Sequence, residues 1–165
     1  MKTAVIYHSV TGNTKNMAEH IVKGMQSVEG VEAKAFSIDE VDSAFVNECG
    51  AVVFGGPIYA GHISAPMFSY IQGGSKDLKL AGKLVGAFAT AQYVHGGAEV
   101  GIHDILDTCM VKGALIYSGG GACGAPVIHF GPVGIDNTLD IEQFAPNFEV
   151  YGQRMAAKAK ELFEK

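Results

Sequence analysis

The sequence contains no long apolar run. Apolar residues make up 48% of the 165 residues, yet no stretch of them approaches the roughly 20 residues that a membrane-spanning helix needs. Residues Met1 to Ala4 lead directly into an apolar segment that is too short for a signal peptide. The sequence therefore predicts no membrane span and a cytoplasmic protein.

Basic residues are also few, and they are not gathered into a stripe. The chain has 12 Lys and Arg against 17 Asp and Glu, which gives a net charge of −5. Without a basic stripe, nucleic acid is not an expected partner. The acidic excess is too mild to indicate a dedicated acidic docking surface.

Cysteine is scarce. The three cysteines, Cys49, Cys109 and Cys123, are widely spaced, and no CxxC pair occurs. This pattern indicates neither a zinc site nor a disulfide framework. Cys49 and Cys109 have apolar neighbours and are expected in the core, whereas Cys123 lies in a glycine-rich segment and is expected at the surface.

Two kinds of hydrophobic pattern alternate along the chain. Strands are predicted at residues 4–7, 31–38, 50–54, 83–90 and 114–117. Helices are predicted at residues 14–27, 39–49, 64–71, 98–110 and 148–162, the third of them capped by Ser64. This alternation predicts one α/β domain over residues 1–165, with a doubly wound, five-stranded parallel sheet in the strand order 2-1-3-4-5.

Two glycine-rich stretches interrupt this pattern. Gly55–Pro57 is predicted to close the third strand with a loop that runs to His62. Residues Gly119 to Pro146 form a long segment with six glycines and little periodicity. Loops of this length in compact domains are usually functional or contribute to an interface, and we expect one of these roles here.

The segment after the first predicted strand has the composition of a phosphate site. Ser9, Thr11 and Thr14 place three hydroxyl groups beside Gly12, where the backbone N–H groups of a helix begin. Oriented donors and the positive end of a helix dipole suit a phosphate monoester. The plainer alternative is that these residues only cap the helix.

Motifs of other phosphate-binding folds are missing. The loop has no GxxxxGK[ST] motif, which argues against a nucleoside triphosphatase. No CxxxxxR motif follows the first strand, which argues against a tyrosine phosphatase of similar architecture. A response-regulator receiver needs acidic residues where this chain has His8-Ser9 and Gly55-Gly56.

Three glycine-containing loops, residues 9–14, 55–62 and 90–97, follow the first, third and fourth strands. These strands are neighbours in the expected order. The loops should therefore meet at the carboxyl ends of the strands, where parallel α/β sheets bind ligands. The second and third loops add Tyr59, Tyr93 and small residues. Such residues suit a flat aromatic ring that is covered on its faces and hydrogen-bonded at its edge.

These residues resemble the flavodoxin family. The pattern V-I-Y-x-S-x-x-G-x-T-x-x-x-A-x-x-I over Val5 to Ile21 is similar to the flavodoxin signature. Other segments resemble the flavodoxin-like quinone reductases and FMN reductases: Gly56–Gly61, Gly96–Glu99, and the C-terminal helix with Gly152, Arg154 and Ala156. The resemblance covers nearly the whole chain, and it implies a flavodoxin-like fold that binds FMN non-covalently.

By position, the resemblance implies three groups of cofactor-binding residues. The first group surrounds the phosphate and comprises Ser9, Val10, Thr11, Gly12, Asn13 and Thr14. The second lines one side of the flavin ring and comprises Pro57, Ile58, Tyr59, Ala60 and Gly61. The third lines the other side and comprises Thr90, Ala91, Gln92, Tyr93, Gly96 and Gly97. Tyr59 and Tyr93 are the candidates to stack on the ring, and ordinary loop packing is their plainer role.

The chain also departs from the quinone-reductase pattern. Its third loop, Thr90–His95, has less glycine than that group, and Val111 stands where the group usually has a histidine. His95 is a candidate donor to the ring or a substrate, and equally a solvated loop residue. His129 and Cys123 of the long segment are candidates to reach the mouth of the site.

The resemblance implies three functions, of which the first is the one we expect and the second is the alternative. The first is an enzyme that takes hydride from NAD(P)H and reduces a quinone or similar acceptor, with no catalytic residue needed beyond the flavin. The second is a flavodoxin-type one-electron carrier for redox partner proteins. The mild net charge of −5 argues against it, because such carriers are usually strongly acidic around the flavin. The third is a non-enzymatic FMN-binding module in a larger complex. Related quinone reductases also suggest a homo-oligomer that uses residues 119–146.

Overall fold

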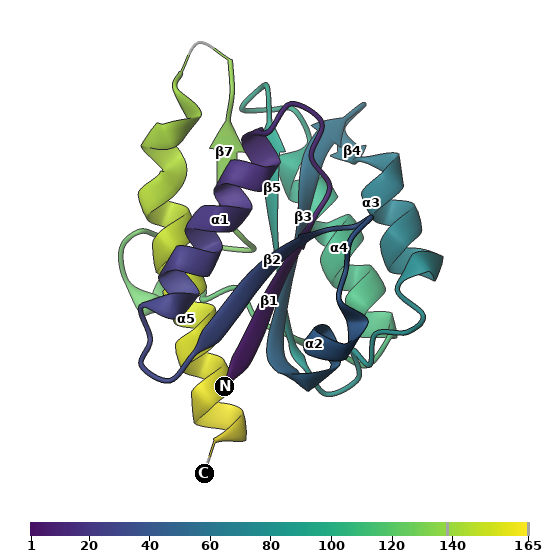
Figure 1. Cartoon of the computed structure of the whole chain (residues 1–165). Helices are drawn as coiled ribbons and strands as arrows, with labels where there is room; N and C mark the ends of the chain where they lie inside the picture. Colours follow the sequence, from purple (N-terminus) through teal and green to yellow (C-terminus); the bar gives the residue numbers. More distant parts are fainter. Residues whose placement is uncertain (138, 165) are drawn as a thin grey trace.

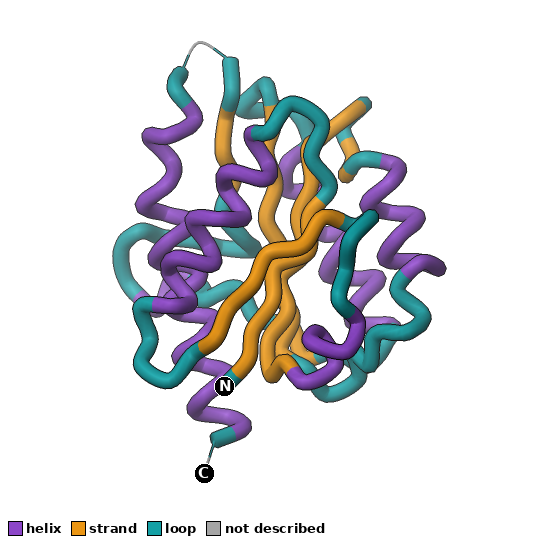
Figure 2. The backbone as a smooth tube through the Cα atoms, in the orientation of Figure 1, coloured by secondary structure: helices purple, strands orange, loops and turns teal. Residues whose placement is uncertain are grey.

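Parallel strands form the centre of the molecule, and helices cover both faces of the sheet (Figures 1 and 2). The computed structural model describes residues 1–137 and 139–164. The sheet has the order β2-β1-β3-β5-β6, with the bounds β2 Glu32–Ser37, β1 Lys2–Tyr7, β3 Cys49–Tyr59, β5 Leu84–Ala91 and β6 Leu115–Ile116. The predicted order is confirmed, because β5 and β6 are the fourth and fifth strands once the short hairpin strand β4 (His62–Ile63) is set apart.

The helices divide between the two faces of the sheet. Helices α1 (Asn13–Gln26) and α5 (Ala145–Phe163) cover one face, and α2 (Ser43–Glu48), α3 (Ala65–Ser69) and α4 (Ala98–Val111) cover the other (Figure 1). In the described part of the chain, no helix combines the length and the apolar character needed to cross a membrane.

Each face of the sheet has its own apolar core. Met17 of α1, Phe148 of α5 and Val5 of β1 belong to one core. Ile105 of α4 and Phe54 of β3 belong to the other. All five side chains are fully buried. Because the central strands are covered on both faces, their sequences are nearly continuous apolar runs, and this made them predictable.

The second helix starts later than predicted, and the third starts at the predicted place but without the predicted capping hydrogen bond. The second helix begins after Asp42 and not at Asp39, because the Asp42 carboxylate caps it by accepting the Phe45 N–H at 3.0 Å. Ser64 precedes α3 as expected, but its hydroxyl makes no capping hydrogen bond and lies 2.9 Å from Nδ1 of His8. The hydroxyl therefore ties the end of β1 to α3.

The third strand is longer than predicted. The prediction that Gly55–Pro57 ends it is wrong, because β3 continues to Tyr59 and a tight turn leads into the antiparallel strand β4. Gly55 serves close packing here. A Cβ at this position would lie 2.1 Å from Cε1 of Phe88 on the neighbouring strand β5.

The long segment Gly119–Pro146 is more regular than predicted. It contains the short 3-10 helices η2 (Gly121–Cys123) and η3 (Ile141–Phe144), the strand β7 (Val133–Ile135) and the start of α5. Strand β6 pairs with the beginning of β5, and β7 pairs with its end, both in parallel. The two short strands β6 and β7 thus both pair with β5 where one fifth strand was predicted. The residues between them, 117–132, are an insertion beside this edge strand.

The cysteines lie as predicted. Cys49 and Cys109 are buried, and Cys123 is exposed. Burial raises the pKa of Cys49 and that of Cys109 to about 12, which keeps both thiols protonated and unreactive.

A tyrosine of α5 reaches the sheet at a glycine of β5. Tyr151 is fully buried, and burial raises the pKa of its hydroxyl, which stays neutral. A Cβ on Gly86 would lie 2.0 Å from the Tyr151 hydroxyl oxygen and 3.0 Å from Cε of Met155. Because glycine has no side chain, position 86 leaves room for the Tyr151 hydroxyl between α5 and the sheet.

This contact predicts a non-additive pair of substitutions. Gly86→Ala should lower the free energy of unfolding by about 1–3 kcal/mol, because the new methyl group overpacks the core. Tyr151→Phe removes the clashing oxygen, so Gly86→Ala should cost less than half as much in the Tyr151→Phe background. Urea denaturation of the four proteins measures this coupling. Strictly additive effects would contradict the placement of the hydroxyl.

Candidate functional site

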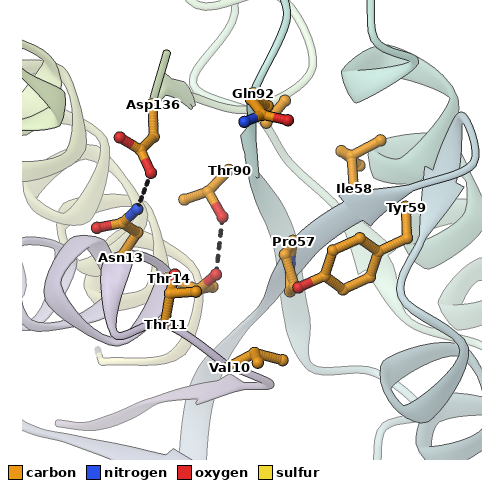
Figure 3. A pocket seen from close by; sticks show the side chains of 11 residues that line it. Val10, Thr11, Asn13, Thr14, Pro57, Ile58, Tyr59, Thr90, Gln92 and Asp136 are labelled. Carbon is orange, nitrogen blue, oxygen red and sulfur yellow. Dashed lines mark hydrogen bonds between the residues drawn. The ribbon is translucent and has the colours of Figure 1, made fainter. Parts of the chain in front are cut away.

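A hollow of about 220 Å³ lies at the carboxyl ends of β3 and β5, against the first turn of α1 (Figure 3). Its walls are formed by Val10, Thr11, Asn13, Thr14, Pro57, Ile58, Tyr59, Thr90, Ala91, Gln92 and Asp136. Strand pairing brings these residues together, since Pro57 lies beside Thr90 in the parallel register of β3 and β5. All three segments that the sequence singled out thus reach one place.

The first wall is the N-terminal turn of α1. Gly12 precedes the helix with a φ of 98°, and a Cβ there would meet nothing within 4 Å. The Lys15 N–H donates to Oγ of Ser9 at 3.2 Å. The N–H groups of Asn13 and Thr14, which begin the helix, have no acceptor within it. This turn therefore offers open space and backbone donors to an anion.

A hydroxyl pair joins α1 to the end of β5. Oγ1 of Thr14 lies 2.7 Å from Oγ1 of Thr90, and the two residues are only 2% and 4% exposed (Figure 3). One hydroxyl donates to the other, so the accepting hydroxyl keeps its own proton to donate. A ligand oxygen in the hollow would satisfy this donor.

Asp136 is a wall residue that the sequence reasoning missed. It follows β7, its N–H donates to the Ala91 carbonyl at 2.9 Å, and its carboxylate accepts a hydrogen bond from the side-chain amide of Asn13 (Figure 3). Strand β7 is three residues long and pairs with the distant β5. Local periodicity therefore carries no signal that would have placed Asp136 here.

The opposite wall is the end of β3 with its hairpin turn. Pro57, Ile58 and Tyr59 line the hollow from this side. Gly97, at a φ of 93°, packs so closely against the turn that a Cβ would lie 2.2 Å from the Gly61 carbonyl oxygen. These two glycines hold the third loop against the hairpin and do not line the hollow themselves.

The mouth of the hollow is bordered by exposed apolar side chains. Val10 and Tyr59, which line it, are 65% and 50% exposed. Tyr93, which follows the wall residue Gln92, is 60% exposed. A planar ligand in this hollow would keep one edge accessible from outside.

Not every predicted site residue lines the hollow. The predicted residues outside its walls are Ser9, Gly12, Ala60, Gly61, Tyr93, Gly96 and Gly97. His129 lies elsewhere, in a second hollow of about 320 Å³ beside Phe130 and Glu99. Cys123 lies with its Sγ 3.7 Å from the Tyr117 hydroxyl. Neither of these last two residues is a wall residue of the first hollow.

The donors of the hollow are electrically neutral. None of its wall residues is Lys or Arg. Burial lowers the pKa of His8, at the end of β1, so its imidazole is uncharged near neutral pH. An anion in the hollow would therefore be held by hydroxyl, amide and backbone N–H groups, with the Asp136 carboxylate as the charged wall residue. This donor set suits the phosphate of FMN, and the apolar wall of β3 suits its ring.

Comparisons with known proteins lead to the same cofactor. A family model described as a flavodoxin domain matches residues 4–101. A flavodoxin from Clostridium saccharobutylicum is 38% identical over 163 residues, which cover 99% of this chain and 100% of that protein. The chain belongs to the flavodoxin family. Flavodoxins are FMN proteins, so the expected cofactor is confirmed, and with it a flavin-based redox role.

Two further matches, one to a sequence and one to a solved structure, involve related proteins. An NAD(P)H dehydrogenase (quinone) from Syntrophobacter fumaroxidans is 28% identical, and the match covers 98% of each chain. A solved flavodoxin from the domain Archaea has a TM-score of 0.74 at 23% identity, covering 97% of this chain and 99% of that one. The structural match confirms the flavodoxin-like fold.

The hydroxyl pair predicts how FMN binding responds to charge at Thr14. Thr14→Glu should weaken FMN binding at least about a hundredfold, because it places a carboxylate against the phosphate. Thr14→Val, the neutral control of matched shape, should weaken binding only about tenfold by removing one hydrogen bond. Quenching of FMN fluorescence gives both dissociation constants, and circular dichroism confirms folding. Wild-type affinity in folded Thr14→Glu would refute a phosphate at this turn.

Proposed function

We propose that the hollow holds FMN with its phosphate at the first turn of α1. Asn13 and Thr14 would donate to the phosphate oxygens through their backbone N–H groups and side chains. The flavin ring would lie between the β3 wall, at Pro57 and Tyr59, and the third loop, at Gln92. When bound, the flavin supplies the redox chemistry. The protein binds it, orients it and limits the access of water to its buried side.

The function that this geometry supports best is one-electron transfer between redox partner proteins. The observation that carries it is the open edge, where Val10, Tyr59 and Tyr93 are at least half exposed. Electrons can pass to a partner through an exposed ring edge without a substrate entering the site. The flavodoxin that matches this chain along its whole length supports the same function.

The net charge of −5 is milder than that expected of such a carrier, so partner binding would depend less on charge than in a strongly acidic carrier. Charge on a carrier mainly accelerates the encounter with a partner and selects its orientation. The exposed apolar side chains of Val10, Tyr59 and Tyr93 add contact area that does not depend on charge. A partner would then bind by shape and apolar contact around the flavin edge, with weak dependence on ionic strength.

A quinone reductase is the second candidate, because relatives named NAD(P)H dehydrogenase (quinone) share 28% identity with this chain. In this case NAD(P)H and a quinone would use the open side of the ring in turn. The carrier is favoured because the flavodoxin relative is the more similar of the two, with 38% identity over 99% of this chain.

Two earlier expectations stay predictions. One is the cytoplasmic location. A homo-oligomer through residues 119–146 remains an inference from the resemblance to quinone reductases.

Turnover measurements separate the carrier from the reductase. The FMN-loaded protein, mixed with NADH or NADPH and a water-soluble quinone, should reduce the quinone no faster than free FMN does. The same protein, first reduced with dithionite, should reduce cytochrome c rapidly, and a reductive titration should show two separated one-electron steps. Nicotinamide-dependent turnover in the enzymatic range of about 1 s⁻¹ or more would contradict the carrier and establish the reductase.

A further inference from the structure

A carboxylate shares the hollow with the turn that is proposed to bind phosphate. Asp136 lines the hollow and accepts a hydrogen bond from the side chain of Asn13, the first residue of α1 (Figure 3). A phosphate bound at the N–H groups of this turn would therefore lie within about one side-chain length of the carboxylate. Both groups are negatively charged, so they repel each other.

No cation in the walls offsets this repulsion. The wall residues include neither Lys nor Arg, and none of the ion pairs among the described residues involves Asp136. Phosphate sites usually combine helix N-termini with Lys or Arg. Among the wall residues, the attraction comes from the helix start and from neutral donors such as Thr14.

The carboxylate is held in place by its surroundings. The Asp136 N–H is bound to the Ala91 carbonyl of β5, and its carboxylate is bound to Asn13. One turn further along α1, the Asn16 side chain donates to Glu142 of η3 in the same way. These two contacts join Asp136 and Glu142 to α1, so Asp136 cannot move away without breaking a hydrogen bond to α1.

We propose that Asp136 is a specificity-determining residue that penalises phosphate binding at α1. Ligands that bind only through a phosphate are then rejected. A ligand is retained when an aromatic ring between Tyr59 and Gln92 adds enough binding energy to offset the repulsion. The proposal rests on the phosphate placement proposed above.

Neutralising this carboxylate provides the test. Asp136→Asn keeps the shape of the side chain and should tighten FMN binding by roughly five- to twentyfold, the range expected for like charges at a partly screened site. Riboflavin, which lacks the phosphate, should bind both proteins equally. Inorganic phosphate, titrated directly, should also bind Asp136→Asn more tightly than the wild type.

Salt dependence gives a second readout of the same proposal. Wild-type affinity for FMN should rise between about 10 mM and about 1 M salt, where the Debye length falls from about 30 to about 3 Å and repulsion is screened. This rise should be smaller in Asp136→Asn. Glu142→Gln is the matched control, because it removes an equal charge from the same segment outside the hollow, and it should preserve most of the rise.

The outcomes distinguish the proposal for Asp136 from the proposed placement of the phosphate, on which it rests. If Asp136→Asn weakens FMN and riboflavin alike, Asp136 is a hydrogen-bond acceptor for the shared part of the ligand and the proposal is wrong. Unchanged FMN affinity in Asp136→Asn also contradicts it. If Thr14→Glu leaves FMN binding intact, the phosphate placement itself has failed.

Discussion

The parallel pairing of β1, β3 and β5 determines where the functional groups of this protein lie. These strands are adjacent and run in one direction. The turn after β1, the hairpin after β3 and the loop after β5 therefore all lie at the carboxyl-terminal end of the sheet. Close contacts at glycines preserve this arrangement. Gly55 admits the Phe88 ring, and Gly131 packs where a Cβ would lie 2.0 Å from the Ala87 carbonyl oxygen, which seats the insertion beside β5.

Much of the fold was predictable because its causes are local. Central strands covered on both faces need apolar side chains at successive positions, and the runs around Val5, Phe54 and Phe88 show this. The turn after β1 was also visible as a candidate phosphate site, because it places hydroxyls beside a glycine at a helix start. The role of an individual glycine was less predictable. A glycine such as Gly55 is compatible both with a turn and with a close contact between strands. Asp136 was missed because only a non-local strand pair brings it to the site.

The electrostatics and the shape of the hollow point to the same kind of function. Neutral donors at Asn13 and Thr14 can hold a phosphate without a compensating cation, and the buried Thr14–Thr90 pair fixes the inner end of the site. At the outer end, Tyr59 and Tyr93 have exposed side chains. A cofactor whose ring edge lay at this end would suit electron exchange across a protein surface better than reactions that require an enclosed substrate.

The central claim is that the phosphate and the ring of FMN bind to separate segments of the chain. Amide NMR spectra of the protein, titrated with FMN and then with riboflavin, test it most directly. The account predicts that both ligands shift the signals of residues 58–61 and 91–97, whereas only FMN shifts those of residues 11–14. Equal shifts at residues 11–14 with riboflavin, or none there with FMN, would contradict the account.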